Sequence, residues 1–107
     1  MDKVIRNGNV AVLYSPGFGA GWYTWNTDVE ACLFDPEIVA LVEQGADAAA
    51  IVKVAEKKWN QGKDYFYPGG AEDLEIEWIP EGTAFDVQEC DGSESIRTAG
   101  MIPTIKA

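Results

Sequence analysis

The alternation of hydrophobic and polar positions divides the chain into a hairpin, a helical middle and a strand-rich C-terminal part. Lys3–Arg6 and Asn9–Ser15 flank Asn7-Gly8, which is the most favourable two-residue sequence for a type I′ hairpin turn. Val10–Tyr14, inside the second of these strands, is apolar at every position. We therefore expect this strand to be covered on both of its faces.

Two helices are predicted in the middle of the chain. Asp35-Pro36-Glu37 is a helix-start sequence, with an acidic N-cap, a proline at the first helical position and a glutamate that favours the helix dipole. Gly45 is a suitable C-terminal stop for this helix. The second helix is expected from about residue 46 or 47 to Trp59. Its apolar residues fall on one helical stripe: Ala48, Ile51, Val52, Ala55 and Trp59.

The C-terminal part is predicted to form a three-stranded antiparallel β-meander. Its strands, separated by turn sequences, are Asp73–Ile79, Thr83–Glu89 and Ser93–Thr98. In the first of them, Leu74, Ile76 and Trp78 are expected on a buried face and the acidic residues on a solvated one. The tail, residues 100–107, is expected to dock on the sheet or to add an edge strand.

The order β-β-α-α-β-β-β makes residues 1–107 a single α+β domain, with the helices packed on one face of an antiparallel sheet. The length of 107 residues and the 47% hydrophobic content are ordinary for a domain with its own core. No apolar run reaches the roughly 18 residues of a membrane helix. Because Met1–Lys3 also lacks the pattern of a signal peptide, we expect a soluble cytoplasmic protein.

The net charge restricts the partners. Eighteen acidic residues against eight basic ones give −10 at pH 7. Such a chain is repelled by nucleic-acid phosphates and anionic lipid, so we expect no direct contact with nucleic acid or membrane. A basic protein surface, or a small ligand in a pocket of different local charge, fits better. The reading that acidity serves only solubility also stays open.

The absence of histidine excludes much catalytic chemistry. It removes His-based triads and general bases and nearly every common zinc or iron site. Cys32 and Cys90 lack the short spacing of a metal or redox pair, so both are expected to be small core residues, with a disulfide between them as the alternative. The sequence also has no D-x-D-x-D-G calcium loop. We therefore expect no enzyme activity, metal or cofactor, with a carboxylate- and metal-dependent hydrolase as the remaining catalytic alternative.

The segment from Tyr14 to Asn26, YSPGFGAGWYTWN, combines glycines with aromatic rings. Gly17, Gly19 and Gly21 have neither the Lys and Ser/Thr of a P-loop nor the spacing of a dinucleotide fingerprint. The sequence therefore does not support a nucleotide-binding loop of either kind. The backbone N–H groups of such a loop can still form a small anion-binding nest.

A second loop, Tyr65–Gly70, again combines rings with glycine. Glycine allows close backbone approach, while Trp and Tyr supply rigid amphipathic area. Convergence of the two loops would make a core cap, a protein interface that includes self-association, or a small-ligand pocket with Arg6 or Lys63 as anion partner. The candidate ligand- or partner-binding residues are Phe18, Trp22, Tyr23, Trp25, Tyr65, Phe66 and Tyr67.

An acidic face is the second candidate surface. Asp73, Glu75 and Glu77 alternate along one predicted strand, at intervals of about 6.7 Å. That is about half the charge density of one DNA strand, with a charge every roughly 3.4 Å. Neighbouring strands must therefore contribute, and Asp86 and Glu94 are the candidates. An acidic nucleic-acid mimic is accordingly an alternative function.

Three segments, Val12–Trp22, Ile76–Thr83 and Asp91–Ile96, resemble small uncharacterised proteins of tailed bacteriophages. The resemblance spans most of the chain and implies a phage or prophage accessory protein in the bacterial cytoplasm. Such proteins often bind and inhibit host machinery, some by imitating DNA and others by sequestering a nucleotide signal.

The leading hypothesis is a non-enzymatic binding protein. We expect a homodimer or small homo-oligomer that engages a host protein with a basic surface through its aromatic loops and acidic faces. The alternatives are a protein that binds or sequesters a nucleotide or sugar, and the nucleic-acid mimic.

Overall fold

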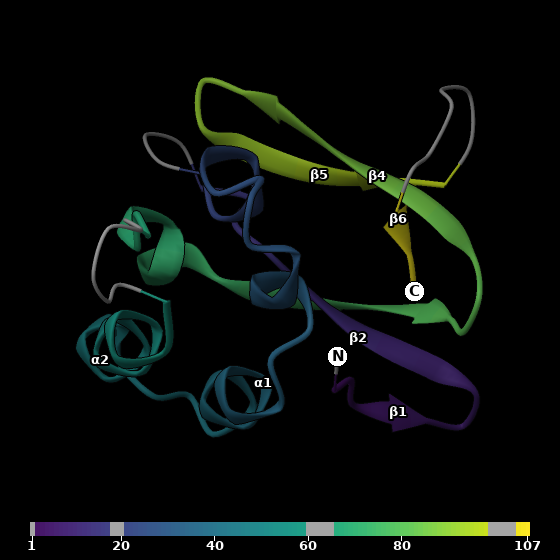
Figure 1. Cartoon of the computed structure of the whole chain (residues 1–107), viewed down its shortest axis with the longest axis horizontal. Helices are drawn as coiled ribbons and strands as arrows, with labels where there is room; N and C mark the ends of the chain where they lie inside the picture. Colours follow the sequence, from purple (N-terminus) through teal and green to yellow (C-terminus); the bar gives the residue numbers. More distant parts are fainter. Residues whose placement is uncertain (1, 18–20, 60–65, 99–104) are drawn as a thin grey trace.

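The computed structural model describes residues 2–17, 21–59, 66–98 and 105–107, which form two packed sheets with helices on one side (Figure 1). The strands are β1 (Ile5–Arg6), β2 (Asn9–Tyr14), β3 (Glu75–Pro80), β4 (Ala84–Cys90), β5 (Ser93–Arg97) and β6 (Ile105–Lys106). The helices are α1 (Pro36–Glu43) and α2 (Ala48–Trp59), with the 3₁₀ helices η1 (Tyr23–Trp25), η2 (Glu30–Leu33) and η3 (Gly69–Asp73). The predicted α+β class is confirmed.

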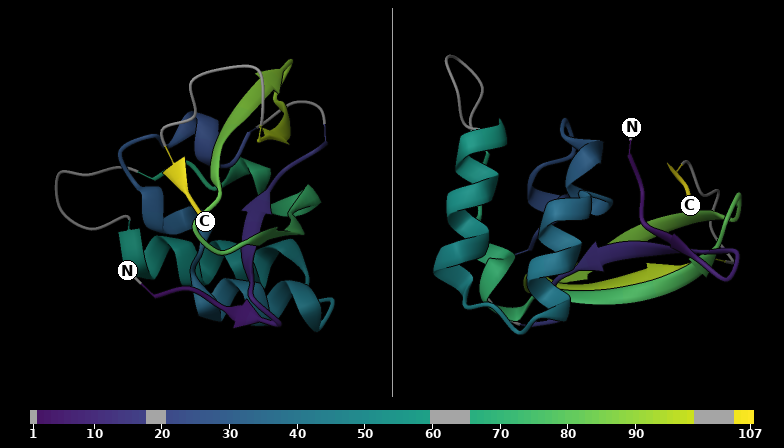
Figure 2. Two further views of the ribbon diagram at one scale, coloured as in Figure 1. Left: turned by 90° about the vertical axis from the view of Figure 1, so that its right-hand side faces the viewer. Right: turned by 90° about the horizontal axis from the view of Figure 1, so that it is seen from below.

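The local predictions for the hairpin and the helices are confirmed. Asn7 and Gly8 join β1 to β2 with φ angles of 52° and 79°, as a type I′ turn requires. The Asp35 side chain caps α1 by accepting a hydrogen bond of 3.1 Å from the backbone N–H of Ile38. Gly45 follows α1 with φ of 73°. The two helices lie side by side, next to the strands (Figure 2).

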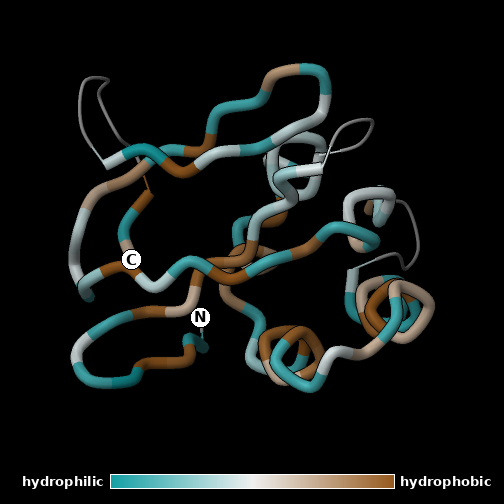
Figure 3. Tube along the Cα trace, turned by 180° about the vertical axis from the view of Figure 1, so that it is seen from behind, coloured by the Kyte–Doolittle hydropathy of each residue, from teal (hydrophilic) through white to brown (hydrophobic). Residues whose placement is uncertain are grey.

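Strand β2 separates two apolar cores, which explains why it is apolar on both faces. Ala11 and Leu13 pack with the buried residues of α1 and α2. Val10 and Val12 point to the opposite face and pack with the second sheet, for example with Phe85. Hydrophobic segments on both helices and on the strands that cross the middle of the molecule reflect these two cores (Figure 3).

The C-terminal strands do not form the predicted meander. β3 pairs antiparallel with β2, from Asn9↔Pro80 to Tyr14↔Glu75, and completes a β1-β2-β3 sheet. β4 pairs with β5, as the meander predicts, but its other neighbour is β6 and not β3, so these strands form a second sheet. In a single meander, the face of β2 that carries Val10 would be exposed. In the structure the second sheet packs on this face and buries it.

Two details of β3 also differ from the prediction. The strand begins at Glu75, and Asp73 ends η3 instead. Trp78 is 38% exposed whereas Ile79 is 2% exposed. The strand register explains why Ile79 is the buried residue of the two. Ile79 lies opposite Val10, in the core shared with the second sheet. Trp78 instead lies against the Arg6 guanidinium, outside both cores.

The tail and the cysteines complete the fold. Ile105–Lys106 adds an edge strand to β4, as expected for the tail. Cys32 is buried as predicted, but Cys90 is exposed at the end of β4, so its assignment to the core is wrong. Both thiols are free. Within the described part of the chain, no helix has the length and apolarity needed to cross a membrane.

Candidate functional site

The two aromatic, glycine-bearing loops meet. An inner pair of rings, Trp22 and Phe66, has its centroids 5.0 Å apart in an edge-on arrangement. An outer pair, Trp25 and Tyr67, is also separated by 5.0 Å. The loops approach so closely because Gly70 has no side chain. A Cβ atom at this position would lie 2.5 Å from the backbone oxygen of Gly21.

The inner pair belongs to the core and does not offer a surface to a partner. Trp22 and Phe66 are both completely buried. The Trp22 indole donates a hydrogen bond of 2.7 Å to the backbone oxygen of Cys32, and the Trp59 ring packs 4.9 Å from Phe66. Trp22 and Phe66 were candidate binding residues, and the structure instead assigns them to the support of the loops. Burial also raises the pKa of the Cys32 thiol well above its usual value.

The outer pair is exposed, and we call Trp25 and Tyr67 the aromatic patch. Trp25 is 42% exposed and Tyr67 is 38% exposed. The Trp25 indole donates a hydrogen bond of 2.7 Å to the carboxylate of Glu89 on β4. Tyr23, which precedes the patch, is half-buried, and its pKa is raised mainly by desolvation. Phe18 and Tyr65, the other candidates, lie outside the described residues.

Asn26 joins the two loops through its side-chain amide. The Nδ2 group donates to the backbone oxygens of Trp22, at 2.6 Å, and Tyr67, at 2.9 Å. The Oδ1 atom accepts the backbone N–H of Tyr67 at 2.7 Å. Three hydrogen bonds of one buried side chain therefore join the backbone of Tyr67 to that of Trp22, in the segment that carries Trp25.

Glu94 is the residue of this site that the sequence analysis did not identify. It lies on β5 and is 2% exposed. Its Oε1 atom accepts the backbone N–H of Ser15 at 2.8 Å. Its Oε2 atom accepts the backbone N–H groups of Trp22 and Thr24, at 2.9 and 2.8 Å, and the Thr24 hydroxyl at 2.7 Å. A buried carboxylate with four donors is compensated for its lost hydration.

The Glu94 carboxylate occupies the position of a bound anion beside the segment from Tyr14 to Asn26. The backbone N–H groups of Ser15, Trp22 and Thr24 converge on an anion, and this anion is the chain's own Glu94 carboxylate. Glu94 therefore contributes no charge to the surface, contrary to the expectation that it extends an acidic face. One signal in the sequence could have indicated that Glu94 is buried. Glu94 lies two residues before Ile96, so both side chains point to the same, inward-facing side of β5.

The candidate acidic face is divided among three elements. Glu75 and Glu77 lie on one side of β3, opposite Tyr14 and Val12 of β2. Burial, Glu75 and Glu77 together raise the pKa of Tyr14. Asp73 lies in η3 with its carboxylate against Gly17. Asp86 lies on β4 in the second sheet, opposite Arg97. The strands next to Glu75 and Glu77 therefore do not fill the gaps in the charge row.

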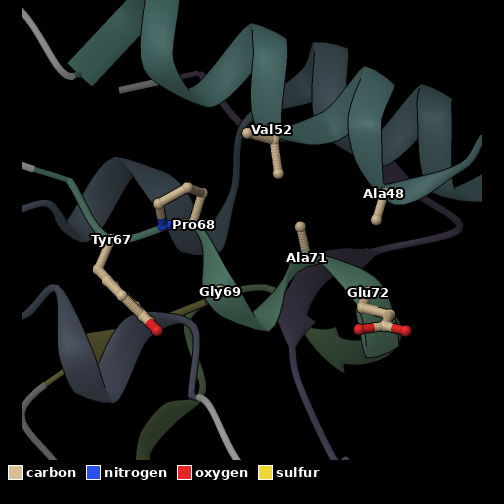
Figure 4. A pocket seen from close by; sticks show the side chains of 7 residues that line it. All are labelled: Ala48, Val52, Tyr67, Pro68, Gly69, Ala71 and Glu72. Carbon is tan, nitrogen blue, oxygen red and sulfur yellow. The ribbon is translucent and has the colours of Figure 1, made fainter.

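An apolar cleft lies beside the aromatic patch, between α2 and η3, and we call it the α2–η3 cleft (Figure 4). Its volume is about 310 Å³. The lining residues are Ala48, Val52, Tyr67, Pro68, Gly69, Ala71 and Glu72. Val52 and Ala71 point toward each other across the cleft, the Glu72 carboxylate lies at the Ala48 end, and the Tyr67 side chain leads away from it.

Of the two candidate anion partners, Arg6 is already paired and Lys63 lies outside the described residues, and Lys58 of α2 is also paired. Glu43 accepts two hydrogen bonds from the Arg6 guanidinium, at 2.5 and 2.8 Å. Lys58 pairs with Asp35 at 2.9 Å and with Glu37 at 3.3 Å, and the hydrogen bond to Asp35 is the main cause of its raised pKa. In the described ranges, no group of three or more acidic or cysteine side chains is arranged to hold a metal ion.

The comparisons with known proteins identify no relative. No protein-family model matches the chain, and neither a curated protein nor a solved structure was found to match it.

Proposed function

We propose that this chain is a non-enzymatic binding protein that engages a basic surface of a partner protein through the aromatic patch and the carboxylates around it. The observation that carries the proposal is the patch itself, two rings 5.0 Å apart that are 42% and 38% exposed. Trp and Tyr are among the residue types that dominate the binding energy of protein interfaces.

The rings of the patch are held in place without a partner. Glu89 fixes the Trp25 indole, and Asn26 fixes the backbone of Tyr67. Glu94 anchors η1, the short helix that carries Trp25. Because these groups are already ordered, binding loses less conformational entropy than it would with free loops. The fixed position of the two rings therefore supports a binding role.

The charge around the patch favours a basic partner. Glu89 contacts Trp25, and Glu72 lies in η3, two residues beyond the Tyr67–Gly70 loop. The whole chain carries −10. Negative potential of this size accelerates the approach of a basic protein at low salt and repels nucleic acid. The resemblance to phage accessory proteins makes a bacterial host protein the first partner to test, and self-association through the same rings is the second.

The alternative functions have less support. A nucleotide needs a cation for its phosphates, but none of the described residues that line the α2–η3 cleft is basic, and Arg6 is paired with Glu43. A nucleic-acid mimic needs a regular row of charges, whereas Glu75, Glu77, Asp73 and Asp86 lie on three different elements. A thermal-shift screen of nucleotides and sugars tests the first alternative, because a ligand at 100 times its Kd stabilises by about 2.7 kcal/mol.

The proposal is tested by affinity capture from bacterial lysate with three matched baits. These are the wild-type chain, Trp25→Ala with Tyr67→Ala, and Trp78→Ala, which removes an equally exposed ring that lies outside the patch. We expect a protein that the wild type and Trp78→Ala capture at low salt and that the double variant loses. Equal capture by all three baits, or no specific capture, would contradict the proposal. Light scattering of the same three proteins measures self-association.

A further inference from the structure

The α2–η3 cleft is small. Its volume of about 310 Å³ is at the lower end of the roughly 300–1,000 Å³ range of small-molecule sites. The walls are aliphatic, since Val52 of α2 faces Ala71 of η3, and Pro68 lies at one end (Figure 4). A straight methylene chain is therefore a suitable occupant for the middle of the cleft.

Among the described residues that line the cleft, the one with a charged side chain is acidic. Glu72 lies at the Ala48 end, is exposed, and has no salt bridge with any basic residue in the described part of the chain. On α2, Glu56 follows Val52 by four residues and so lies on the same side of the helix. The neighbouring lysines, Lys53 and Lys57, fall about 100° and 140° away from Val52 around the helix axis. The cleft therefore combines an apolar middle with a negative rim.

We propose that the α2–η3 cleft receives an arginine side chain of the partner protein, with its methylene stem between Val52 and Ala71 and its guanidinium group at Glu72. Arginine fits better than lysine because its guanidinium group is less strongly hydrated and pairs with a carboxylate through two hydrogen bonds. Tyr67 belongs to the aromatic patch and also lines the cleft, so the two sites are adjacent and one partner surface can contact both. This inference rests on the proposed function and names the residue type that the partner must supply.

The test uses n-butylguanidinium, which reproduces the arginine side chain, and N-butylurea, a neutral compound of nearly the same shape. Amide chemical shifts of the ¹⁵N-labelled protein report binding. We expect n-butylguanidinium to shift the Gly69, Gly70 and Ala71 signals in a saturable manner and N-butylurea to bind more weakly. Glu72→Gln should weaken n-butylguanidinium binding roughly two- to fivefold, as loss of an exposed ion pair does. Glu75→Gln, which removes an equal charge outside the cleft, should leave the affinity unchanged.

Absence of shifts at η3 would overturn the inference. So would equal affinity for the two compounds, or equal effects of Glu72→Gln and Glu75→Gln. If capture of a partner depends on Trp25 and Tyr67 while n-butylguanidinium does not bind, only the arginine site fails. If n-butylguanidinium binds but no partner is captured through the patch, the proposed function fails and the preference of the cleft for a guanidinium group stands.

Discussion

The Glu94 carboxylate accepts the backbone N–H of Trp22 at 2.9 Å, although 72 residues separate the two in the chain. This contact connects β5 to the segment that carries the aromatic patch. The same carboxylate also accepts the backbone N–H groups of Ser15 and Thr24, so a single buried side chain holds the end of β2 next to the start of η1.

Replacing Glu94 should therefore destabilise the whole fold. Glu94→Ala leaves three backbone N–H groups and the Thr24 hydroxyl without their acceptor. We expect a loss of about 3–5 kcal/mol in the free energy of unfolding, because each buried donor left without an acceptor costs about 1–3 kcal/mol. Urea unfolding followed by circular dichroism measures it. Glu81→Gln, at an exposed turn position, is the control and should change the free energy by less than about 0.5 kcal/mol. Similar stabilities for the two variants would show that Glu94 does not hold the loop.

Gly70→Ala should interfere with the contact between the two loops. The new methyl group would overlap the Gly21 backbone, which cannot move away as a flexible side chain could. We expect destabilisation of about 1–3 kcal/mol and a change in tryptophan fluorescence. Gly45→Ala is the comparison, because Gly45 has a φ of 73° but open space around it. Its cost comes from the backbone conformation alone, about 1–2 kcal/mol, and it should leave the fluorescence unchanged. An unperturbed fluorescence spectrum in Gly70→Ala would contradict the close approach.

The two cysteines should differ in reactivity. Cys90 is exposed and should react with a thiol reagent in the native protein. Cys32 is completely buried, and burial raises its thiol pKa, so it should react only after unfolding. Mass spectrometry after brief alkylation, with and without urea, distinguishes one modified cysteine from two. Native modification of Cys32 at a rate similar to that of Cys90 would contradict the buried position.

Stability should decrease in alkaline solution. The pKa of Lys58 is raised from 10.5 by its pairing with Asp35, and those of Tyr14 and Tyr23 are raised from 10.0 mainly by burial. A pKa that is higher in the folded state means that the stabilisation is complete below the unfolded value and is lost as the pH rises through the folded value. The free energy of unfolding should therefore fall above about pH 10.

Lys58→Met isolates the lysine contribution to this alkaline loss. The variant should start less stable at pH 8 and lose less stability than the wild type between about pH 9 and 11.5, because the Lys58 proton no longer participates. Lys53→Met removes an equal charge from the same helix at an exposed position and should follow the wild-type curve. Parallel curves for Lys58→Met and the wild type would contradict the pairing of Lys58 with Asp35.

The turn and the helix start that local signals predict agree with the structure, whereas the pairing of β3 with β2, which depends on distant contacts, was not predicted. Asn7-Gly8 and the Asp35 cap contain their own turn and helix-start chemistry, and β2 is apolar because both of its faces are covered. The partner of β3 depends on contacts between residues that are 69 positions apart, as Val10 and Ile79 are, and no local sequence signal exists for them.

The candidate site shows the same division. Rings beside glycine correctly indicated two loops suited to close approach. The sequence could not separate the buried Trp22 from the exposed Trp25, because that depends on which rings face Phe66 and Trp59. Glu94 appeared to be one more surface acid, since its four donors come from the other end of the chain.

The central claim, that the aromatic patch is the binding surface, is tested most directly by calorimetric titration of the captured partner into three purified proteins. Trp25→Ala should weaken binding by at least about 2 kcal/mol, or roughly 30-fold, relative to the wild type, as expected for an interface hot spot. Trp78→Ala should bind as the wild type does. Equal affinities of Trp25→Ala and the wild type, with Trp25→Ala still folded by circular dichroism, would contradict the claim.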